Sequence, residues 1–194
     1  VQEALRTIQH TVDEMTQQVR ELLDAARLQL GRPLDLHREA VDLVPLVREL
    51  VESWDTTSSD HAVQFESAVV TLPCSVDPHR LRRVFANLLS NAVKYSPEGS
   101  TVTVRVWCDR AMETAPVAVI DFHDEGLGIP AAELPRIFEP FFRAANADRA
   151  AGGAGIGLAG ARRIVEQHAG TIAVRSIEGQ GSTFSVRLPM PRGG

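Results

Sequence analysis

The chain has 194 residues, 44% of them hydrophobic, which is enough for one sizeable folded domain plus an appendage. A formal net charge of -5, with acidic and basic residues mixed along the chain, gives no general attraction to nucleic acid or to an anionic membrane surface, so we expect neither as a partner. The two cysteines, Cys74 and Cys108, show neither zinc-ligand spacing nor a disulfide framework, which predicts reduced thiols in the cytoplasm. No apolar run is long enough to cross a membrane, so we expect this segment to be soluble, and an anchor upstream of it is compatible with the sequence.

Residues 1–33 are predicted to form a helix with a narrow apolar stripe. Its apolar residues alternate in steps of three and four, at Leu5, Ile8, Val12, Met15, Val19, Leu22 and Ala26. A stripe this narrow is typical of a seam between two helices and therefore favours a dimer. Gly31 and Pro33 end the helix, which divides the chain into residues 1–33 and residues 34–194.

The second part interleaves helices with short strands. Asp42 and Asp77 are placed to cap two helices, and Pro78 suits the first position of the second one. A third helix is expected at 158–167, and strands are expected at 63–65, 69–72, 101–107, 117–122, 171–177 and 182–188. This order predicts an α+β fold, a two-layer α/β sandwich in which helices cover one face of a mixed sheet.

The helix capped by Asp77 has a polar face although most of it is apolar. Asn87, Asn91 and Lys94, the only lysine of the chain, are spaced by four and three residues and so share one side of the helix. Such faces are often merely solvated, but amides next to a buried stripe need partners, which a ligand can supply. Magnesium fits this chemistry because it commonly takes one or two protein oxygens and keeps waters and phosphate oxygens.

Two glycine clusters follow. In the first, residues 124–130, a carboxylate suited to an exocyclic amine precedes glycines that allow close backbone approach, although a plain turn explains this cluster alone equally well. The second, residues 152–158, opens a helix, and the N–H groups at a helix N-terminus bind anions. It is neither a Walker loop, which requires a Gly-Lys pair, nor part of a dinucleotide fold, which requires a parallel strand–helix–strand unit.

Between the clusters, residues 137–143 are apolar and aromatic, which suggests a buried hinge, and residues 144–153 are small and polar. This composition suits a mobile lid over a nucleotide site and equally an ordinary surface loop.

Taken in order, these segments resemble the catalytic and ATP-binding domain of sensor histidine kinases, within the ATPase superfamily of DNA gyrase and mismatch-repair proteins. The resemblance covers about residues 34–190. The family's N box resembles LRRVFANLLSNAVKYSPEG, its first glycine box DEGLGIP, its F box IFEPFFR, its second glycine box GGAGIGLA, and its closing hairpin GQGSTFSVRLP.

The resemblance implies a site for ATP and Mg²⁺. It implies that Asn91 coordinates Mg²⁺, that Asp124 accepts a hydrogen bond from the adenine amino group, and that Tyr95 lies beside the nucleotide. Asn87 and Arg143 are the implied catalytic residues, and Lys94 is an implied nucleotide-binding residue near the phosphates. The remaining implied contacts are Gly126, Gly128 and Ile129 at the base, Gly153, Gly155, Gly157 and Leu158 at the lid and phosphates, and Thr183 closing the adenine pocket.

As a function, the resemblance implies a histidine protein kinase of a two-component system. It likens residues 1–33 to the second helix of a dimerisation hairpin, with residues 34–194 as the catalytic domain. The implied partners are a second copy of the chain and the receiver domain of a response regulator. The implied location is the cytoplasm, including the cytoplasmic part of a membrane-anchored sensor. His10 lacks the acidic residue that follows a phosphoacceptor histidine, so we expect the acceptor upstream of this chain.

Three alternatives stay open: a gyrase-class ATPase, a nucleotide-binding scaffold without kinase activity, and a serine-directed kinase of the anti-sigma type. Gyrase-class members have a general-base glutamate where this chain has Asn87, which disfavours hydrolysis as the main task. The heptad pattern of residues 1–33 argues against the anti-sigma type. Two departures from the family are Phe142, where tyrosine is common, and Gly160, which weakens the helix after the second glycine box.

Overall fold

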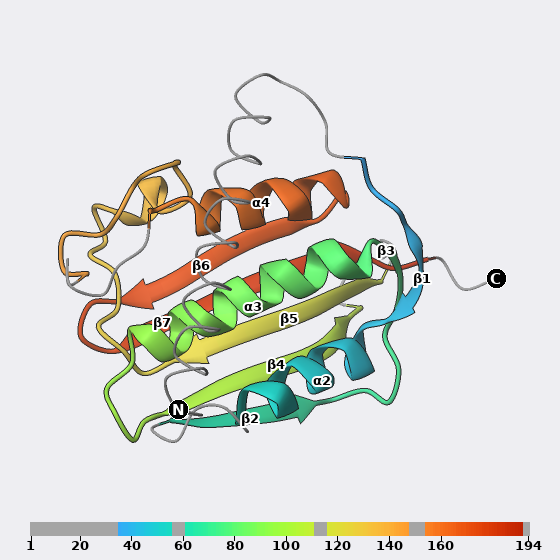
Figure 1. Cartoon of the computed structure of the whole chain (residues 1–194), viewed down its shortest axis with the longest axis horizontal. Coiled ribbons are helices and arrows are strands. Elements are labelled where there is room, and N and C mark those ends of the chain that lie inside the picture. The colour runs from blue at the N-terminus through green and yellow to red at the C-terminus, as the bar shows by residue number, and fades with distance from the viewer. Residues whose placement is uncertain (1–34, 56–60, 111–115, 148–153, 192–194) are drawn as a thin grey trace, which may run out of the picture.

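The computed structural model describes residues 35–55, 61–110, 116–147 and 154–191 (Figure 1). The helix and dimer seam predicted for residues 1–33 lie outside these ranges. Within them, the elements in chain order are β1 (Glu39–Asp42), α2 (Leu43–Asp55), β2 (Ala62–Ser67), β3 (Pro73–Val76), α3 (Pro78–Lys94), β4 (Thr101–Asp109), β5 (Val117–Asp124), η1 (Leu134–Arg136), α4 (Gly157–Gln167), β6 (Thr171–Ile177) and β7 (Gly181–Pro189). None of the helices in these ranges combines the length and the apolar character needed to cross a bilayer.

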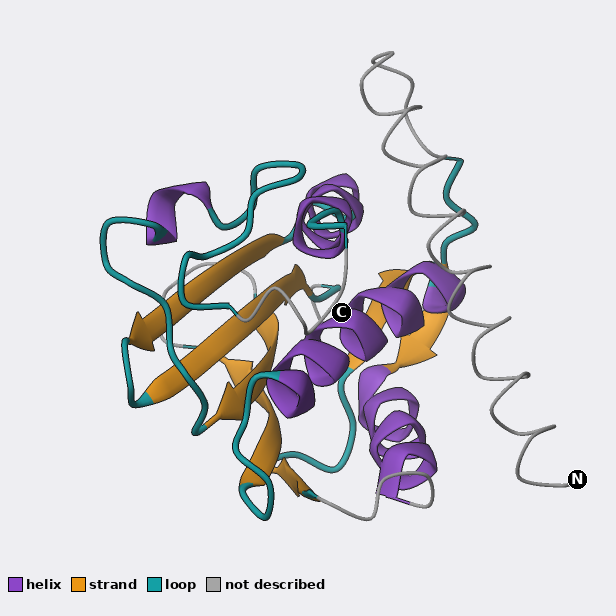
Figure 2. Cartoon of the chain, turned by 60° about the vertical axis from the view of Figure 1, so that its left-hand side comes forward, coloured by secondary structure: helices purple, strands orange, loops and turns teal. Residues whose placement is uncertain are grey.

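The main sheet has five strands in the order β2–β4–β5–β7–β6. Only β2 and β4 pair in parallel, because α3 lies between them in the chain and provides the crossover that parallel neighbours need. The other pairs are antiparallel, so the sheet is mixed, as predicted. Figures 1 and 2 show α2, α3 and α4 on one side of this sheet, which confirms the predicted α+β sandwich.

The core lies between the sheet and the helices. The buried residues of α3 follow the i, i+3, i+4, i+7, i+8, i+11 spacing of one helix face: Leu81, Val84, Phe85, Leu88, Leu89 and Ala92. They face alternate residues of the central strands, and the rings of Phe85 and Phe122 lie 5.9 Å apart between centroids. Burial of this stripe fixes the rotation of α3 about its axis, so the polar residues between the apolar ones must point away from the sheet.

One strand prediction is wrong and one small sheet was not foreseen. Residues 69–72 form no strand, and Val70 is 90% exposed. The strand lies immediately after them, at β3, where Cys74 and Val76 are buried. β3 pairs with β1 in a separate antiparallel sheet. Sequence patterns favoured residues 69–72 because they are richer in β-branched side chains, whereas β3 starts with a proline, which is tolerated at the first position of a strand.

Both predicted aspartate caps are confirmed, and each also fastens a second segment. Asp42 Oδ1 accepts hydrogen bonds from the N–H groups of Val44 (3.0 Å), inside α2, and Leu72 (2.8 Å), at the approach to β3. Asp77 Oδ1 accepts from the Arg80 N–H (3.0 Å) in the first turn of α3, and Asp77 Oδ2 accepts from the His37 N–H (3.0 Å) in the segment before β1. The helix starts are therefore tied to neighbouring chain segments as well as capped.

His168 follows the last turn of α4 and is only 1% exposed. Its Nε2 accepts a hydrogen bond from the Asp77 N–H (2.9 Å), and its Nδ1 lies 2.7 Å from the Ile164 carbonyl oxygen. Because a carbonyl can only accept, the proton is on Nδ1 and the imidazole is neutral. Burial lowers the pKa of His168, and the nearby Arg38 and Arg80 act in the same direction.

We expect the free energy of unfolding to decrease as the pH falls below the ordinary histidine pKa of 6.5. The folded pKa is lowered, so the unfolded chain takes up the proton first, and stability present above pH 6.5 is lost toward the folded-state pKa. Urea unfolding measured across this pH range tests the expectation. His168→Gln should flatten the dependence, whereas the same change at the exposed His79 should not. A His168→Gln protein with the wild-type slope would contradict it.

Candidate functional site

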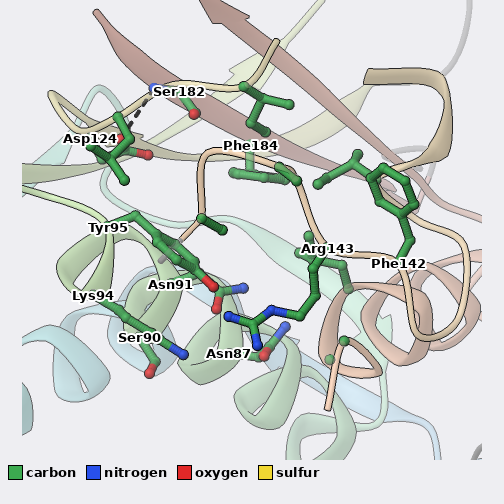
Figure 3. Close-up of a pocket in the computed structure, with 18 of the residues that line it drawn as sticks. Asn87, Ser90, Asn91, Lys94, Tyr95, Asp124, Phe142, Arg143, Ser182 and Phe184 are labelled. Carbon is green, nitrogen blue, oxygen red and sulfur yellow. Dashed lines mark hydrogen bonds between the residues drawn. The ribbon is translucent and has the colours of Figure 1, made fainter. Parts of the chain in front are cut away.

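A cleft with a volume of about 270 Å³ opens between α3, the loop after β5 and the start of α4 (Figure 3). Most of the residues singled out from the sequence line it together, although they come from four separate motifs. These are Asn87, Asn91, Lys94, Tyr95, Asp124, Gly128, Ile129, Arg143, Gly155, Gly157 and Leu158. The fold therefore gathers the N box and both glycine boxes around one cavity.

Among the described residues, two of those expected at the site, Gly126 and Thr183, do not line the cleft. Gly153 lies outside the described residues. Gly126 is buried behind the wall rather than in it. The side chain of Thr183 points to the other face of the sheet, where its Oγ1 lies 3.0 Å from His123 Nδ1. Because side chains alternate along a strand, Ser182 and Phe184 line the cleft in its place.

Asp124 provides a hydrogen-bond acceptor at one end of the cleft. It is 4% exposed, and its Oδ1 accepts from the N–H groups of Gly126 (2.9 Å) and Ser182 (3.2 Å). Burial raises the pKa of Asp124 above its ordinary value, and these two N–H groups offset part of that rise. A carboxylate offers about four acceptor positions, so Asp124 retains capacity for a donor on a molecule in the cleft.

The first glycine loop is held between the end of α3 and the turn after β6. The Leu127 N–H donates to the Tyr95 carbonyl oxygen (3.1 Å). A Cβ atom on Gly126 would lie 2.2 Å from that same oxygen, and one on Gly128 would lie 2.0 Å from the Ile177 carbonyl oxygen. Gly128 also has φ +62°, a conformation that side chains rarely adopt. Glycine is therefore required here for contact as well as for conformation.

The opposite end of the cleft collects hydrogen-bond donors. α4 begins at Gly157 with no side-chain cap and no acidic residue in its first turn, so its positive end is not offset. A Cβ atom on Gly157 would lie 2.3 Å from Asn87 Oδ1, so this glycine brings the helix start against the Asn87 amide. The Asn87 Nδ2 is buried without a hydrogen-bond partner. Such an unpaired buried donor is costly unless a ligand satisfies it.

Two cationic side chains lie at this same end. The Lys94 ammonium lies 5.3 Å from the centroid of the Tyr95 ring. Figure 3 shows the Arg143 guanidinium pointing toward the amides of Asn87 and Asn91, on the far side of the cleft from Asp124. The cleft thus has a carboxylate acceptor at one end and amides, cations and a helix start at the other. Such a distribution suits a molecule with an amine at one end and an anion at the other.

The F box forms part of the wall and connects to the second glycine cluster. Ile137 is buried, but Phe141 is 58% exposed, so the expected buried hinge is only partly buried. The Phe141 N–H donates to the Gly155 carbonyl oxygen (2.8 Å). Phe142, at the position where tyrosine is common, lies under the Arg136 guanidinium, 4.5 Å from its ring centroid. The F box is thus joined to the loop that leads into α4.

The start of the predicted lid is hydrogen-bonded rather than free. Asn146 Nδ2 donates to the Gly128 carbonyl oxygen (3.1 Å), and the Ala145 N–H donates to Glu133 Oε2 (2.9 Å). Residues 148–153 of the predicted lid lie outside the described residues. Sequence reasoning missed the cleft residues Ser90 and Asn146. Helical spacing from Asn87 could have identified Ser90, whereas Asn146 belongs to no recognisable pattern.

Comparisons with known proteins agree on one family. Residues 76–192 match the family described as "Histidine kinase-, DNA gyrase B-, and HSP90-like ATPase". The sensor histidine kinase WalK of Bacillus subtilis (strain 168) is 32% identical over 191 residues, which cover 95% of this chain and 30% of WalK. The sensor histidine kinase ZraS of Escherichia coli (strain K12) is 38% identical over 181 residues, which cover 92% of this chain and 36% of ZraS. The chain therefore spans about a third of the length of these relatives.

A solved structure supports the same relationship. The structure of the mycobacterial sensor histidine kinase MprB superimposes with a TM-score of 0.67 at 28% sequence identity. The match covers 80% of this chain and 99% of that one. The similarity therefore extends to nearly the whole of the compared domain.

The glycine loop yields a stability prediction. We expect Gly128→Ala to lower the free energy of unfolding by about 2 to 5 kcal/mol, because it combines a left-handed conformation with a clash against the Ile177 backbone. Gly179→Ala is the matched control, with φ +78° and no atom within 4 Å of the added Cβ, and should cost only about 1 to 2 kcal/mol. Urea unfolding compares the two. Equal losses would show that the close contact in the glycine loop is unimportant.

Proposed function

The chain belongs to the family of histidine kinase-, DNA gyrase B- and HSP90-like ATPases, and we propose that it is the ATP-binding kinase core of a two-component sensor. In this proposal it binds ATP with Mg²⁺ and donates the γ-phosphoryl group to a histidine upstream of the chain. A response regulator aspartate then receives the group. Residues 1–33 pair two copies of the chain through their heptad seam, and residues 34–194 carry the catalysis.

The observation that carries this proposal is the polarity of the cleft. Asp124 is a buried acceptor at one end, and the orphaned Asn87 amide with the uncapped start of α4 lies at the other. An adenine amino group suits the first end, and a triphosphate suits the second. Leu127, Gly128 and Ile129 line the wall beside Asp124, where the flat faces of a base would lie.

The residues present also fit a magnesium ion bound with the nucleotide. No group of three His, Cys, Asp or Glu side chains gathers as a metal site anywhere in the described parts of the chain. A metal in the cleft would therefore take most of its oxygens from phosphates and water, which is the usual habit of Mg²⁺. Asn91 is the residue proposed to hold it, through its amide oxygen. The ion would supply neutralisation of phosphate charge.

The proposed chemistry depends on positioning and charge rather than on covalent catalysis. The bond between the γ-phosphorus and the bridging oxygen breaks with ADP as the leaving group. A bond to the γ-phosphorus forms through the lone pair of one imidazole nitrogen, and the proton on the other ring nitrogen passes to water. In this proposal Asn87, Lys94 and Arg143 donate hydrogen bonds to the phosphoryl oxygens and offset their negative charge, at the end of the cleft opposite Asp124. Lys94 now lies over the Tyr95 ring, so it would turn toward the phosphates when nucleotide binds.

A gyrase-class ATPase is the weaker candidate because of the side chain at position 87. Activation of water requires a group that can accept its proton, and a neutral amide such as that of Asn87 cannot do so usefully. Asn87 lies against Gly157 at the edge of the cleft, so closely that a Cβ atom added to Gly157 would clash with the Asn87 amide. The arrangement therefore favours phosphoryl transfer to an external acceptor over hydrolysis.

We expect Asp124→Asn to weaken the binding of Mg-ATP by roughly hundredfold, because an amide donor would then face the adenine amine. Isothermal titration calorimetry on the chain measures this. GTP carries a carbonyl where ATP carries the amine, so its relative affinity should rise. Glu125→Gln, an equivalent change at the exposed neighbour, is the control and should leave both affinities unchanged. Wild-type ATP affinity in Asp124→Asn would reject the assignment.

The kinase activity is tested by incubating the full-length protein with γ-labelled ATP. Acid-labile phosphohistidine should form, and Lys94→Arg should form it roughly fivefold more slowly, because a broad guanidinium does not replace a compact ammonium beside phosphates. Arg105→Lys, in an exposed ion pair with Glu66, is the control for the exchange of cations. Release of free phosphate without phosphohistidine would instead support the gyrase-class alternative.

A further inference from the structure

A hydrogen-bonded cluster lies at the opposite end of α3 and α4 from the cleft. The two helices run antiparallel, so the start of α3 meets the end of α4, as Figure 1 shows. At this end the His168 Nε2 accepts from the Asp77 N–H (2.9 Å). At the other end Gly157 meets Asn87. α4 is thus in contact with α3 at both of its ends.

The contact at His168 is buried and directional. The side chain is 1% exposed, and both ring nitrogens are engaged, one with the N–H of Asp77, the N-cap of α3, and one with the Ile164 carbonyl oxygen on α4. Only the neutral ring with its proton on Nδ1 satisfies both partners. Since a helix is stiff along its axis, fixing the last turn of α4 also fixes the axial position of Gly157.

The same cluster holds the segment that follows residues 1–34. Asp77 Oδ2 accepts from the His37 N–H (3.0 Å). The Arg38 guanidinium donates to the Gln167 carbonyl oxygen at the end of α4. Residues 37–38 therefore contact the start of α3 and the end of α4, the two helices that form the end of the cleft opposite Asp124.

We propose that His168 is a positioning residue for the kinase reaction, which holds α4 along α3 so that the helix start at Gly157 stays against Asn87. The inference rests on the proposed function. It also links residues 37–38 to the cleft indirectly, through Asp77 at the start of α3 and Gln167 at the end of α4. Neither hydrogen-bond partner of His168, Asp77 or Ile164, lines the cleft, so the effect of His168 on nucleotide binding is exerted through α4.

Charge at this cluster makes the contact sensitive to protonation of the ring. Arg38, from the segment before β1, and Arg80, on α3, disfavour the protonated ring, and the Asp77 carboxylate favours it. N–H groups of Arg80 and His37 hold the pKa of Asp77 below its ordinary value against the opposing effect of burial. A proton on Nε2 would remove the acceptor for the Asp77 N–H, so this hydrogen bond would be lost.

Two substitutions separate the two ring nitrogens. His168→Gln can place an amide oxygen near the position of Nε2 and keep the acceptor for Asp77, whereas His168→Asn is too short for this and keeps only a group near Nδ1. Mg-ATP affinity is measured by calorimetry on the full chain, at a temperature where circular dichroism shows each variant folded. We expect His168→Asn to lose roughly tenfold in affinity and His168→Gln to stay close to wild type. His79→Gln, an exposed histidine on α3, is the control.

The outcomes distinguish this inference from the proposed function. A wild-type chain that fails to bind Mg-ATP overturns the proposed function, whatever the variants do. A wild-type chain that binds, together with a folded His168→Asn that binds equally well, overturns the inference alone. Nuclear magnetic resonance of the wild type gives a second measurement that needs no variant to fold. The signals of the Gly157 amide and the Asn87 side-chain amide should shift in step with protonation of His168, and signals that stay constant would overturn the inference.

Discussion

Burial of the apolar stripe of α3 is the constraint on which the rest of the molecule depends. Leu81, Phe85 and Leu88 are fully enclosed against the sheet, so the helix cannot rotate without exposing them. Asn87, Asn91 and Lys94 are interleaved with this stripe and are consequently directed into the cleft. The free energy that folds the domain therefore also orients the amides and the ammonium, before any ligand is present.

Missing side chains shape the cleft as much as present ones do. At Gly126, Gly128 and Gly157 an added β-carbon would come within 2.3 Å of another residue, so only glycine allows these three close approaches. This brings the first glycine loop against Tyr95 and Ile177, and the start of α4 against Asn87. A residue with a β-carbon at any of these points would clash, so glycine determines how closely these segments approach one another.

Short sequence patterns predicted those helices and strands that are determined by residues close together in the chain. The apolar spacing of α3, the Asp77 cap with Pro78, and the strands β4 and β5 all follow from residues close together in the chain. The β1–β3 sheet was missed because its stability comes from pairing across more than thirty residues and from burial of Cys74, neither of which short patterns reveal. The resemblance implies that Thr183 closes the adenine pocket, but its neighbour Ser182 lines the cleft instead. Matching a motif by position does not reveal which side chains of a strand face the cleft. The contacts of His168 and Asn146 join distant segments and carried no signal in the sequence.

The amide at position 87 also bears on how long a bound nucleotide survives. In the proposed kinase, ATP stays bound during each interval in which the acceptor histidine is out of reach. A carboxylate beside the γ-phosphate would activate water during every such interval, so ATP would be hydrolysed without phosphorylating the acceptor. An amide does not activate water, so ATP can stay bound without being hydrolysed. In the proposed kinase, Asn87 therefore limits ATP hydrolysis between signals. The moment of phosphoryl transfer is then set by whatever brings the acceptor histidine near.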